Sequence, residues 1–246
     1  LSEKGPDKKP RLNLKTILMK KTFIAFVLIH FFVFPLYSQD WPNLKRYQAD
    51  NDTLLSGPVP KDRVVFMGNS ITDMWIRSSP SFFNDNHYVD RGISGQTSPQ
   101  MLLRFRADVI QLKPAAVVIE CGTNDIAGNT GPSTLKMTED NIQSMCELAV
   151  ANKIRVIIGS VLPANKFPWA PKVQPADSII ELNKWIRQYA TQHHFGYVDY
   201  YSSLVDENKG MKAGYSGDGV HPNKEGYTVM ENLVQTVIKR TIGKKQ

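Results

Sequence analysis

A serine and a histidine that lie far apart in the chain each sit in a short polar segment suited to nucleophilic catalysis. Ser70 belongs to Gly68-Asn69-Ser70-Ile71-Thr72-Asp73, and His221 belongs to Asp218-Gly219-Val220-His221-Pro222-Asn223. A serine hydroxyl becomes a nucleophile when a histidine takes its proton and a carboxylate orients the histidine ring. Asp218, three residues before His221, is the candidate carboxylate. Each residue alone has a simpler explanation, since a serine before a helix is typical of an N-cap and a single histidine is typically structural or solvated.

Two further segments could supply hydrogen-bond donors for a developing oxyanion. Gly95 lies in a glycine-containing turn that can expose a backbone N–H, and Asn124 lies in Gly122-Thr123-Asn124-Asp125 after the most apolar run of the chain. The alternatives are a tight connection at Gly95 and an ordinary polar loop at Asn124, with Asp125 as a turn former. Combined with the backbone N–H of Ser70, the two donors would form an oxyanion hole.

A parallel sheet would bring these segments to one edge of the domain. Short apolar runs predict buried strands at residues 63–67, 88–91, 115–120, 154–159 and 197–199. Helical spacing of apolar residues predicts helices at residues 99–112, 133–152, 177–193 and 223–239, the last with Asn223 as its N-cap. This alternation predicts an α/β fold, a three-layer α/β/α sandwich with a five-stranded parallel sheet. Sites in such folds lie at the carboxyl ends of the strands, where three of the four segments begin.

The four segments, taken in order, resemble the blocks of the SGNH hydrolases, also called GDSL esterases, which supply Ser, Gly, Asn and His. The resemblance covers essentially all of residues 40–246 and implies a flavodoxin-like sheet. It assigns Ser70 as nucleophile, Asp218 and His221 as its catalytic partners, and Ser70, Gly95 and Asn124 as the oxyanion hole. It identifies no substrate-binding residues.

One position departs from the family pattern. The family usually has Asp where this chain has Asn69. An asparagine keeps an acceptor oxygen of similar geometry and loses the charge. We therefore expect the local loop to survive and Ser70 to be unaffected.

Residues 1–39 are expected to precede the hydrolase domain as an upstream extension and a signal peptide. Met19-Lys20-Lys21 is followed by an apolar run of 12 residues, 23–34, and by Ser38 at a plausible cleavage site. The run is short for a membrane span, although an N-terminal anchor is the alternative. The expected location is outside the cytoplasm, periplasmic or extracellular, without stable membrane insertion after the signal peptide is removed.

The charge of the chain is concentrated in this leader. Residues 1–39 hold seven of the 30 Lys and Arg and two of the 23 Asp and Glu, which leaves 23 basic and 21 acidic residues for the domain. This near balance gives no reason to expect nucleic-acid binding. The two cysteines, Cys121 and Cys146, lie in apolar contexts and are predicted to be buried packing residues, with a single disulfide as the alternative.

The remaining candidates carry weaker signals. His193-His194 has no partners at metal-ligand spacing, so neither a metal nor a cofactor is expected. Trp75 is predicted to pack in the core, and His87 to lie in a surface loop. The loop at residues 162–176 holds Phe167 and Trp169, and it either walls the pocket or is a surface loop held by its prolines.

Three functions are compatible with the sequence. The first is a secreted serine esterase that removes acetyl or other short acyl groups from a small-molecule or glycan ester substrate. The second is a lysophospholipase, thioesterase or arylesterase of the same family. The third is a non-catalytic carbohydrate-binding protein on this fold, which would lack a catalytic residue, whereas all of them are present here.

Overall fold

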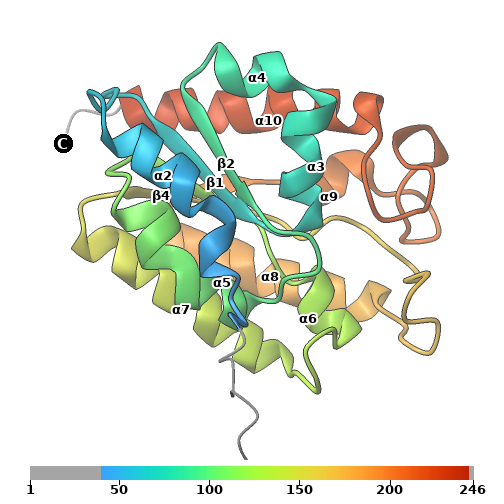
Figure 1. Ribbon diagram of the computed structural model, residues 1–246. Helices are drawn as coiled ribbons and strands as arrows, with labels where there is room; N and C mark the ends of the chain where they lie inside the picture. Colours follow the sequence, from blue (N-terminus) through green and yellow to red (C-terminus); the bar gives the residue numbers. More distant parts are fainter. Residues whose placement is uncertain (1–39, 244–246) are drawn as a thin grey trace, which may run out of the picture. The chain divides into compact units, whose positions relative to one another are not determined.

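Five parallel strands form the centre of the domain in the computed structural model, which describes residues 40–243 (Figure 1). The strands are β1 (Val64–Gly68), β2 (Tyr88–Gly92), β3 (Ala116–Ile119), β4 (Arg155–Gly159) and β5 (Gly196–Val198). Their order across the sheet is β2-β1-β3-β4-β5, and each neighbouring pair is parallel. This is the flavodoxin-like order, and it confirms the predicted fold class. The predicted signal peptide lies outside the described residues.

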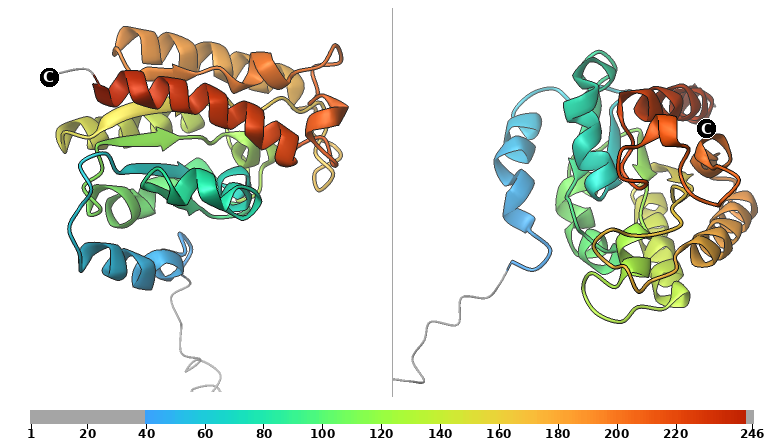
Figure 2. Two further views of the ribbon diagram at one scale, coloured as in Figure 1. Left: turned by 90° about the horizontal axis from the view of Figure 1, so that it is seen from above. Right: turned by 90° about the vertical axis from the view of Figure 1, so that its right-hand side faces the viewer.

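Helices cover both faces of the sheet (Figure 2). Alternate residues along the strands pack against one helical layer or the other. One face packs against α5 (Ser98–Phe105), α7 (Leu135–Ala151) and α8 (Ala176–Gln192), and contains Val65, Val117 and Val156. The other face packs against α3 (Ser70–Ser78), α4 (Pro80–Asn84), α9 (Tyr200–Leu204) and α10 (Lys224–Gly243), and contains Val64, Val118 and Ile157. Burial on both faces explains why the strands are continuous apolar runs without polar alternation.

The four predicted helices are present with small differences at their ends. α7, α8 and α10 correspond to the predicted helices, and Asn223 caps α10 by accepting a hydrogen bond from the N–H of Gly226 at 2.9 Å. The helix predicted at 99–112 is divided into α5 and a π-helical turn, η2 (Arg106–Ile110), in which the N–H of Gln111 donates to the carbonyl oxygen of Arg106. Such π turns are rare in proteins, and those that do occur are frequently found at functional sites.

Several short elements have no counterpart among the predicted ones. They are η1 (Leu44–Tyr47), α2 (Gln48–Leu55), α4, α6 (Thr123–Ala127), α9 and η3 (Ala213–Tyr215). Most are a single turn or two, which is too short for a helical period to show. α2 is longer, but only Asn51 among its residues is buried, so it lacks an apolar stripe. Tertiary contacts determine these elements more than local sequence does.

The end of β2 lies directly against the first turn of α3, the helix that begins at Ser70. A Cβ atom on Gly92 would lie 2.1 Å from the backbone nitrogen of Asp73, so only glycine fits at this contact. In the sheet, β2 lies on one side of β1 and β3 lies on the other. The strand order therefore reverses at β1, and the loops after β1, β2 and β3 meet at this switch point of the sheet. Gly95 lies in the loop after β2, while Ser70 and Asn124 lie in the first turns of α3 and α6, which follow the loops after β1 and β3.

The other single-residue predictions concern packing. Cys121 and Cys146 are buried free thiols, as the packing prediction requires. Trp75 is buried and stacks on Tyr227, and its indole N–H donates to Glu231, so it belongs to the core as predicted. His87 is exposed beside Asp62, as predicted.

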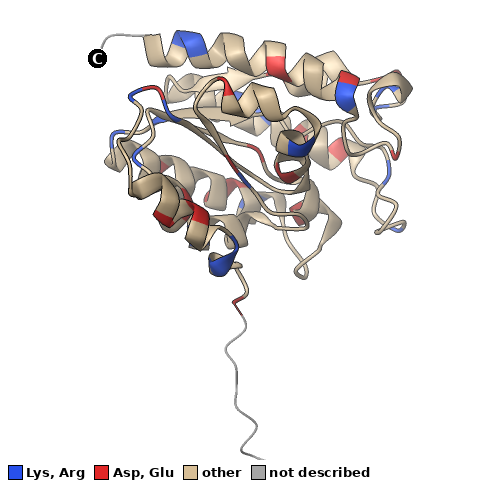
Figure 3. Cartoon of the chain, turned by 45° about the horizontal axis from the view of Figure 1, so that its top comes forward, with Lys and Arg blue, Asp and Glu red and all other residues tan. Residues whose placement is uncertain are grey.

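The surface of the domain carries both signs of charge. Lys and Arg are interspersed with Asp and Glu along the helices and loops visible in Figure 3. Within residues 40–243 no helix combines the length and the apolar character needed to cross a membrane.

Candidate active site

Ser70 is the first residue of α3, directly after the turn that ends β1. The residue that caps the helix is Asn69, whose Oδ1 accepts a hydrogen bond from the N–H of Ile71 at 2.9 Å. The N-cap explanation for Ser70 is therefore wrong, and its hydroxyl is available for another partner. The acceptor oxygen that Asn69 shares with the family's Asp makes the capping bond, as expected, while its Nδ2 is buried with no protein partner among the described residues.

Ser70, His221 and Asp218 form a continuous hydrogen-bonded chain. Ser70 Oγ lies 2.9 Å from His221 Nε2, and His221 Nδ1 lies 2.7 Å from Asp218 Oδ2. Since a carboxylate only accepts, Nδ1 carries a hydrogen and Nε2 is the acceptor for the serine hydroxyl. This is the tautomer that a general base needs. Two segments separated by about 150 residues are thus joined as the sequence predicted.

The turn around Asp218 holds the carboxylate at several points. Its Oδ1 accepts the backbone N–H groups of Val220 at 2.9 Å and His221 at 2.8 Å. Ser216 Oγ lies 2.7 Å from the carbonyl oxygen of His221 and accepts the N–H of Gly219 at 2.9 Å. Partial burial raises the pKa of Asp218, but the hydrogen bonds from His221 and Val220 outweigh it and lower the pKa to about 2. Asp218 is therefore ionised at every pH at which the protein would work.

The segments that carry the two expected oxyanion donors, Gly95 and Asn124, are joined by the side chain of Asn129. Gly95 has a φ of +79°, a left-handed conformation that favours glycine. Asn124 lies in α6, and its Nδ2 donates to the carbonyl oxygen of Gln96 at 2.9 Å. Asn129 donates to the carbonyl oxygen of Gly95 at 3.2 Å and to Oδ1 of Asn124 at 3.0 Å. These bonds hold the Asn124 amide in one orientation and leave its second Nδ2 hydrogen for another acceptor.

Helix α3, which begins at Ser70, and the Gly95 turn are also bonded to each other. Ser94 Oγ donates to Asp73 Oδ2 at 2.5 Å, so α3 contacts the residue directly before Gly95. Arg77 and Arg46 flank the same carboxylate at 3.0 and 3.9 Å. Among residues 40–243 no hydrogen bond links Ser70 directly to Gly95 or Asn124. The structure thus brings Ser70, Asp218 and His221 into contact and connects Gly95 and Asn124 to them only through neighbours.

The long loop between β4 and α8 reaches His221. Trp169 is 43% exposed, and its ring centre lies 6.0 Å from that of His221. Its other contacts fix the indole, because the ring stacks on buried Phe167 at 5.1 Å and the indole N–H donates to Asn129 Oδ1 at 3.0 Å. Of the two explanations for this loop, these contacts favour a wall beside the site.

Two residues of the site were missed or misassigned by the sequence analysis. Asp125 is not merely a turn former, because its carboxylate accepts the N–H and the hydroxyl of Ser98 and so fixes the start of α5. Asn129 carried no local signal at all, since its role depends on contacts with two other loops. The position of Asp125 directly after Asn124, a candidate site residue, was a sequence signal that could have indicated a role for Asp125 in holding the site.

The structure offers little to bind a metal. In the part of the chain that the structure describes, no three His, Cys, Asp or Glu side chains lie close enough together to hold an ion. His193 instead packs on the ring of Tyr189, with ring centres 4.4 Å apart.

Comparison with known proteins identifies the family. Residues 66–229 match the GDSL-like lipase/acylhydrolase family, and this matched range includes both Ser70 and His221. The chain belongs to this family. A GDSL-like lipase from Bacteroides thetaiotaomicron is 50% identical, with a TM-score of 0.78 over 81% of this chain and 98% of that one. A protein from Bacteroides fragilis, provisionally described as an acylhydrolase, is also 50% identical, with a TM-score of 0.79 over 83% of this chain and all of that one.

A more distant relative is similar over part of the GDSL domain. Esterase TesA of Pseudomonas aeruginosa is 32% identical over 139 residues, which is 56% of this chain and 62% of that esterase. The match therefore spans less than two thirds of the curated relative. An acetylxylan esterase from Geobacillus stearothermophilus shares the fold, with a TM-score of 0.59 at 20% identity over 75% of this chain and 95% of that one.

Proposed function

We propose that this GDSL family member is an exported serine ester hydrolase that removes acetyl or other short acyl groups from carbohydrate substrates. The observation that carries the proposal is the connected chain from Ser70 Oγ through His221 to Asp218, at 2.9 and 2.7 Å. A carbohydrate-binding protein without activity has no need for this geometry.

The acylation half-reaction begins at Ser70. His221 Nε2 takes the hydroxyl proton as Oγ attacks the carbonyl carbon of the ester, and the carbonyl electron pair moves to the oxygen. The backbone N–H groups of Ser70 and Gly95 and the amide of Asn124 stabilise that oxyanion. The tetrahedral intermediate collapses, the bond to the alcohol oxygen breaks, and His221 returns its proton to the leaving alcohol. Asp218 stabilises the imidazolium throughout and remains ionised.

Deacylation uses the same groups with water as the nucleophile. His221 Nε2 takes a proton from water, the hydroxide oxygen attacks the acyl carbon, and the same donors stabilise the second oxyanion. Collapse of this intermediate breaks the bond to Ser70 Oγ, which receives the proton from His221. The products are the carboxylic acid and the free enzyme.

The preference for a short acyl group on a sugar is supported by the surroundings of His221. Trp169 offers an exposed and fixed indole where the leaving alcohol would depart, and a flat aromatic surface with a polar edge suits an amphipathic ring. The acetylxylan esterase shows only that the same fold can carry such an activity in another protein. The second candidate is a lysophospholipase, thioesterase or arylesterase of the same family, and the similarity to esterase TesA supports ester hydrolysis in general without distinguishing the two candidates.

Hydrolysis assays would test the proposal. We expect the protein to cleave p-nitrophenyl acetate and acetylated xylo-oligosaccharides faster than p-nitrophenyl esters of eight or more carbons. Folded Ser70→Ala protein should lose most activity, retain a small residual acceleration, and fail to react with a fluorophosphonate that labels the wild type. Faster cleavage of the long-chain esters would favour the second candidate, and equal turnover in Ser70→Ala would overturn the mechanism.

A further inference from the structure

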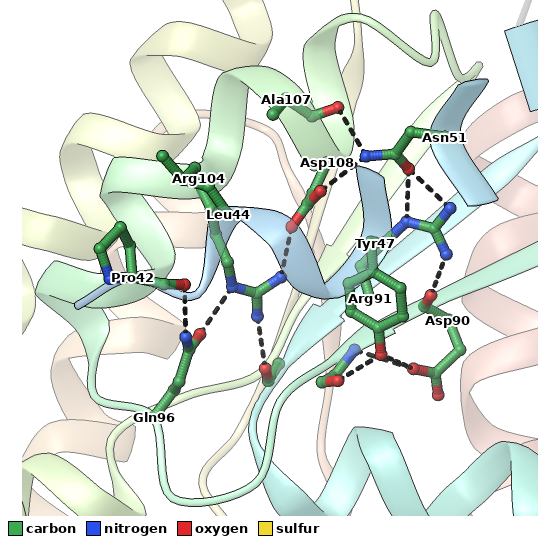
Figure 4. Close-up of polar contacts among 12 residues, drawn as sticks. Pro42, Leu44, Tyr47, Asn51, Asp90, Arg91, Gln96, Arg104, Ala107 and Asp108 are labelled. Atoms are coloured by element: carbon green, nitrogen blue, oxygen red, sulfur yellow. Dashed lines mark hydrogen bonds and ion pairs between the residues drawn. The ribbon is translucent and has the colours of Figure 1, made fainter. Parts of the chain in front are cut away.

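Arg104 in α5 connects the segment before the nucleophile to the segment after the oxyanion turn (Figure 4). Its Nη2 donates to the carbonyl oxygen of Gly68 at 2.9 Å, and its Nε donates to Oε1 of Gln96 at 2.6 Å. Gly68 lies two residues before Ser70, and Gln96 directly follows Gly95. One planar guanidinium therefore bonds to both catalytic segments at fixed directions.

This arginine is fully buried, with no exposed side-chain surface. Its Nη1 pairs with Asp108 Oδ2 at 3.0 Å, and Asp108 Oδ1 accepts a further bond from Asn51 at 2.8 Å. Removing two charges from water costs free energy that their attraction often fails to recover, and apolar residues of similar volume are frequently as stabilising. Stability alone therefore does not explain why a charged arginine is buried here. Its directional hydrogen bonds to Gly68 and Gln96 do explain it, because an apolar side chain could not make them.

Gln96 is the residue through which this network reaches the oxyanion hole. Its backbone carbonyl accepts the Nδ2 donor of Asn124 at 2.9 Å, while its side-chain amide donates to the carbonyl oxygen of Pro42 at 2.7 Å. With the bond from Arg104, Gln96 is held at three points. A shift of Gln96 would move the Gly95 N–H and the Asn124 amide together.

The chain before β1 supports the same turn from outside. Tyr47 donates its hydroxyl to the carbonyl oxygen of Gly92, and Arg91 donates to Asn51 Oδ1 at 2.9 Å (Figure 4). Trp41 accepts a bond from Gln100 at 2.7 Å. These partners lie at residues 41–51, before the family match begins at residue 66. The support for the turn from this segment therefore comes from outside the range that the family model matches.

We propose that Arg104 and Gln96 are positioning residues that set the separation between Ser70 and the oxyanion donors, with residues 41–51 as the outer part of this support. The proposal rests on the proposed esterase activity. Oxyanion donors act at 2.7–3.1 Å from the oxygen, and a displacement of about 1 Å can cost about 100-fold in rate. Loss of the support should therefore lower kcat more than it changes KM.

The test compares Gln96→Met, Arg104→Met and Arg104→Lys with a matched control, Arg63→Met. Arg63 is also buried, and it donates to the carbonyl oxygen of Leu112 at 2.9 Å, at the opposite end of β1 from the site. Each protein is measured for kcat and KM with p-nitrophenyl acetate, for inhibition by a trifluoromethyl ketone that forms a tetrahedral adduct with Ser70, and for melting temperature.

We expect Gln96→Met and Arg104→Met to lower kcat by roughly 10- to 100-fold with KM changed less than about threefold. The ketone should bind more weakly by the factor lost from kcat/KM. Arg104→Lys, which keeps the charge, should be intermediate, and Arg63→Met should lower the melting temperature while kcat stays near the wild type. If Arg104→Met does not fold, Gln96→Met decides, because it leaves the Arg104–Asp108 pair in place.

A folded Gln96→Met protein with wild-type kcat and ketone affinity would overturn the proposal, as would an equal loss of kcat in Arg63→Met. These outcomes differ from failure of the proposed function. In that case the wild type itself would not hydrolyse the ester, or Ser70→Ala would be as active, and the positioning role would fall with it.

Discussion

The carboxylate of Asp218 is held by a turn only a few residues long. Two backbone N–H groups and the imidazole of His221 donate to it, and together they keep its pKa near 2. A carboxylate that does not take a proton can only orient the ring and stabilise its positive charge. Asn124 is held in a comparable way by Gln96 and Asn129, so that both side chains are oriented before substrate arrives.

Replacing Asp218 with asparagine tests this orienting role. In Asp218→Asn an amide faces His221 Nδ1 and favours the tautomer with a hydrogen on Nε2, which cannot accept the proton of Ser70. We expect kcat to fall by roughly 10³- to 10⁴-fold, less completely than in His221→Ala. Steady-state kinetics on both variants, with circular dichroism as the folding control, would measure this. Unchanged turnover in Asp218→Asn would shift attention to another acid such as Asp73.

Replacing Asn124 tests the oxyanion hole. Asn124→Ala should lower kcat by roughly 10²- to 10³-fold, about 3–4 kcal/mol, with little change in KM, because the donor acts mainly in the transition state. Asn124→Asp should do at least as much harm, since an ionised carboxylate donates nothing and repels the oxyanion. If Asn124 were an ordinary loop residue, the aspartate would be tolerated. Kinetics of the two variants beside their melting temperatures separate these outcomes.

Elements differ in how far the sequence alone could predict them. The strands are continuous apolar runs and the long helices carry apolar residues at helical spacing, so the type of each element and its place along the chain were predicted. The four segments that carry Ser70, Gly95, Asn124 and His221 could be singled out because each has a local motif next to a strand or helix end. Arg104, Asn129 and Trp169 could not be predicted in this way, because each also bonds to or packs on a segment more than 30 residues away, Gly68 for Arg104, Gly95 for Asn129 and His221 for Trp169. The loop carrying Trp169 shows this most clearly, since its sequence fitted a wall and a plain surface loop equally well.

Truncating Trp169 tests whether its loop is part of the substrate site. Trp169→Ala should raise KM for an acetylated xylo-oligosaccharide by about 5- to 10-fold, roughly 1 kcal/mol, with a smaller effect on p-nitrophenyl acetate. Trp169→Phe keeps a ring that can stack on Phe167 and should recover most of the loss. Trp185→Ala, on α8, removes an aromatic ring stacked on Tyr189 and serves as the control. If KM for the acetylated xylo-oligosaccharide in Trp169→Ala stayed at the wild-type value, the loop would be a surface loop only.

At the scale of the whole molecule, buried acids couple folding to pH. Burial raises the pKa of Glu120 to about 8, with the charge of Asp125 adding to the effect, and neither carboxylate oxygen has a protein partner among the described residues. Burial also raises the pKa of Asp90 to about 7, against the lowering effect of the bond from the Gly92 N–H. Both groups keep a proton in the folded protein that they lose in the unfolded chain above their ordinary pKa.

The sign of the resulting pH dependence follows from proton counting. From about pH 4.5, the ordinary pKa of a glutamate, to about pH 8, the folded protein binds one more proton at Glu120 than the unfolded chain does. The free energy of unfolding therefore decreases as pH rises through this range, by about 1.4 kcal/mol per pH unit for one such group. Asp218 acts in the opposite sense and only below about pH 4, where its lowered pKa makes stability fall as pH falls.

The variant Glu120→Gln removes one of these protons and should flatten the slope. Urea unfolding at pH 5, 6, 7 and 8 gives the free energy at each pH, and the comparison of slopes does not depend on how well the buried amide is accommodated. We expect the wild type to lose stability across the series and Glu120→Gln to lose less, with the remainder due to Asp90. Glu207→Gln, an exposed position, should keep the wild-type slope. Equal slopes in Glu120→Gln and the wild type would mean that Glu120 is ionised in the folded protein, and that its buried carboxylate has a solvent or ion partner.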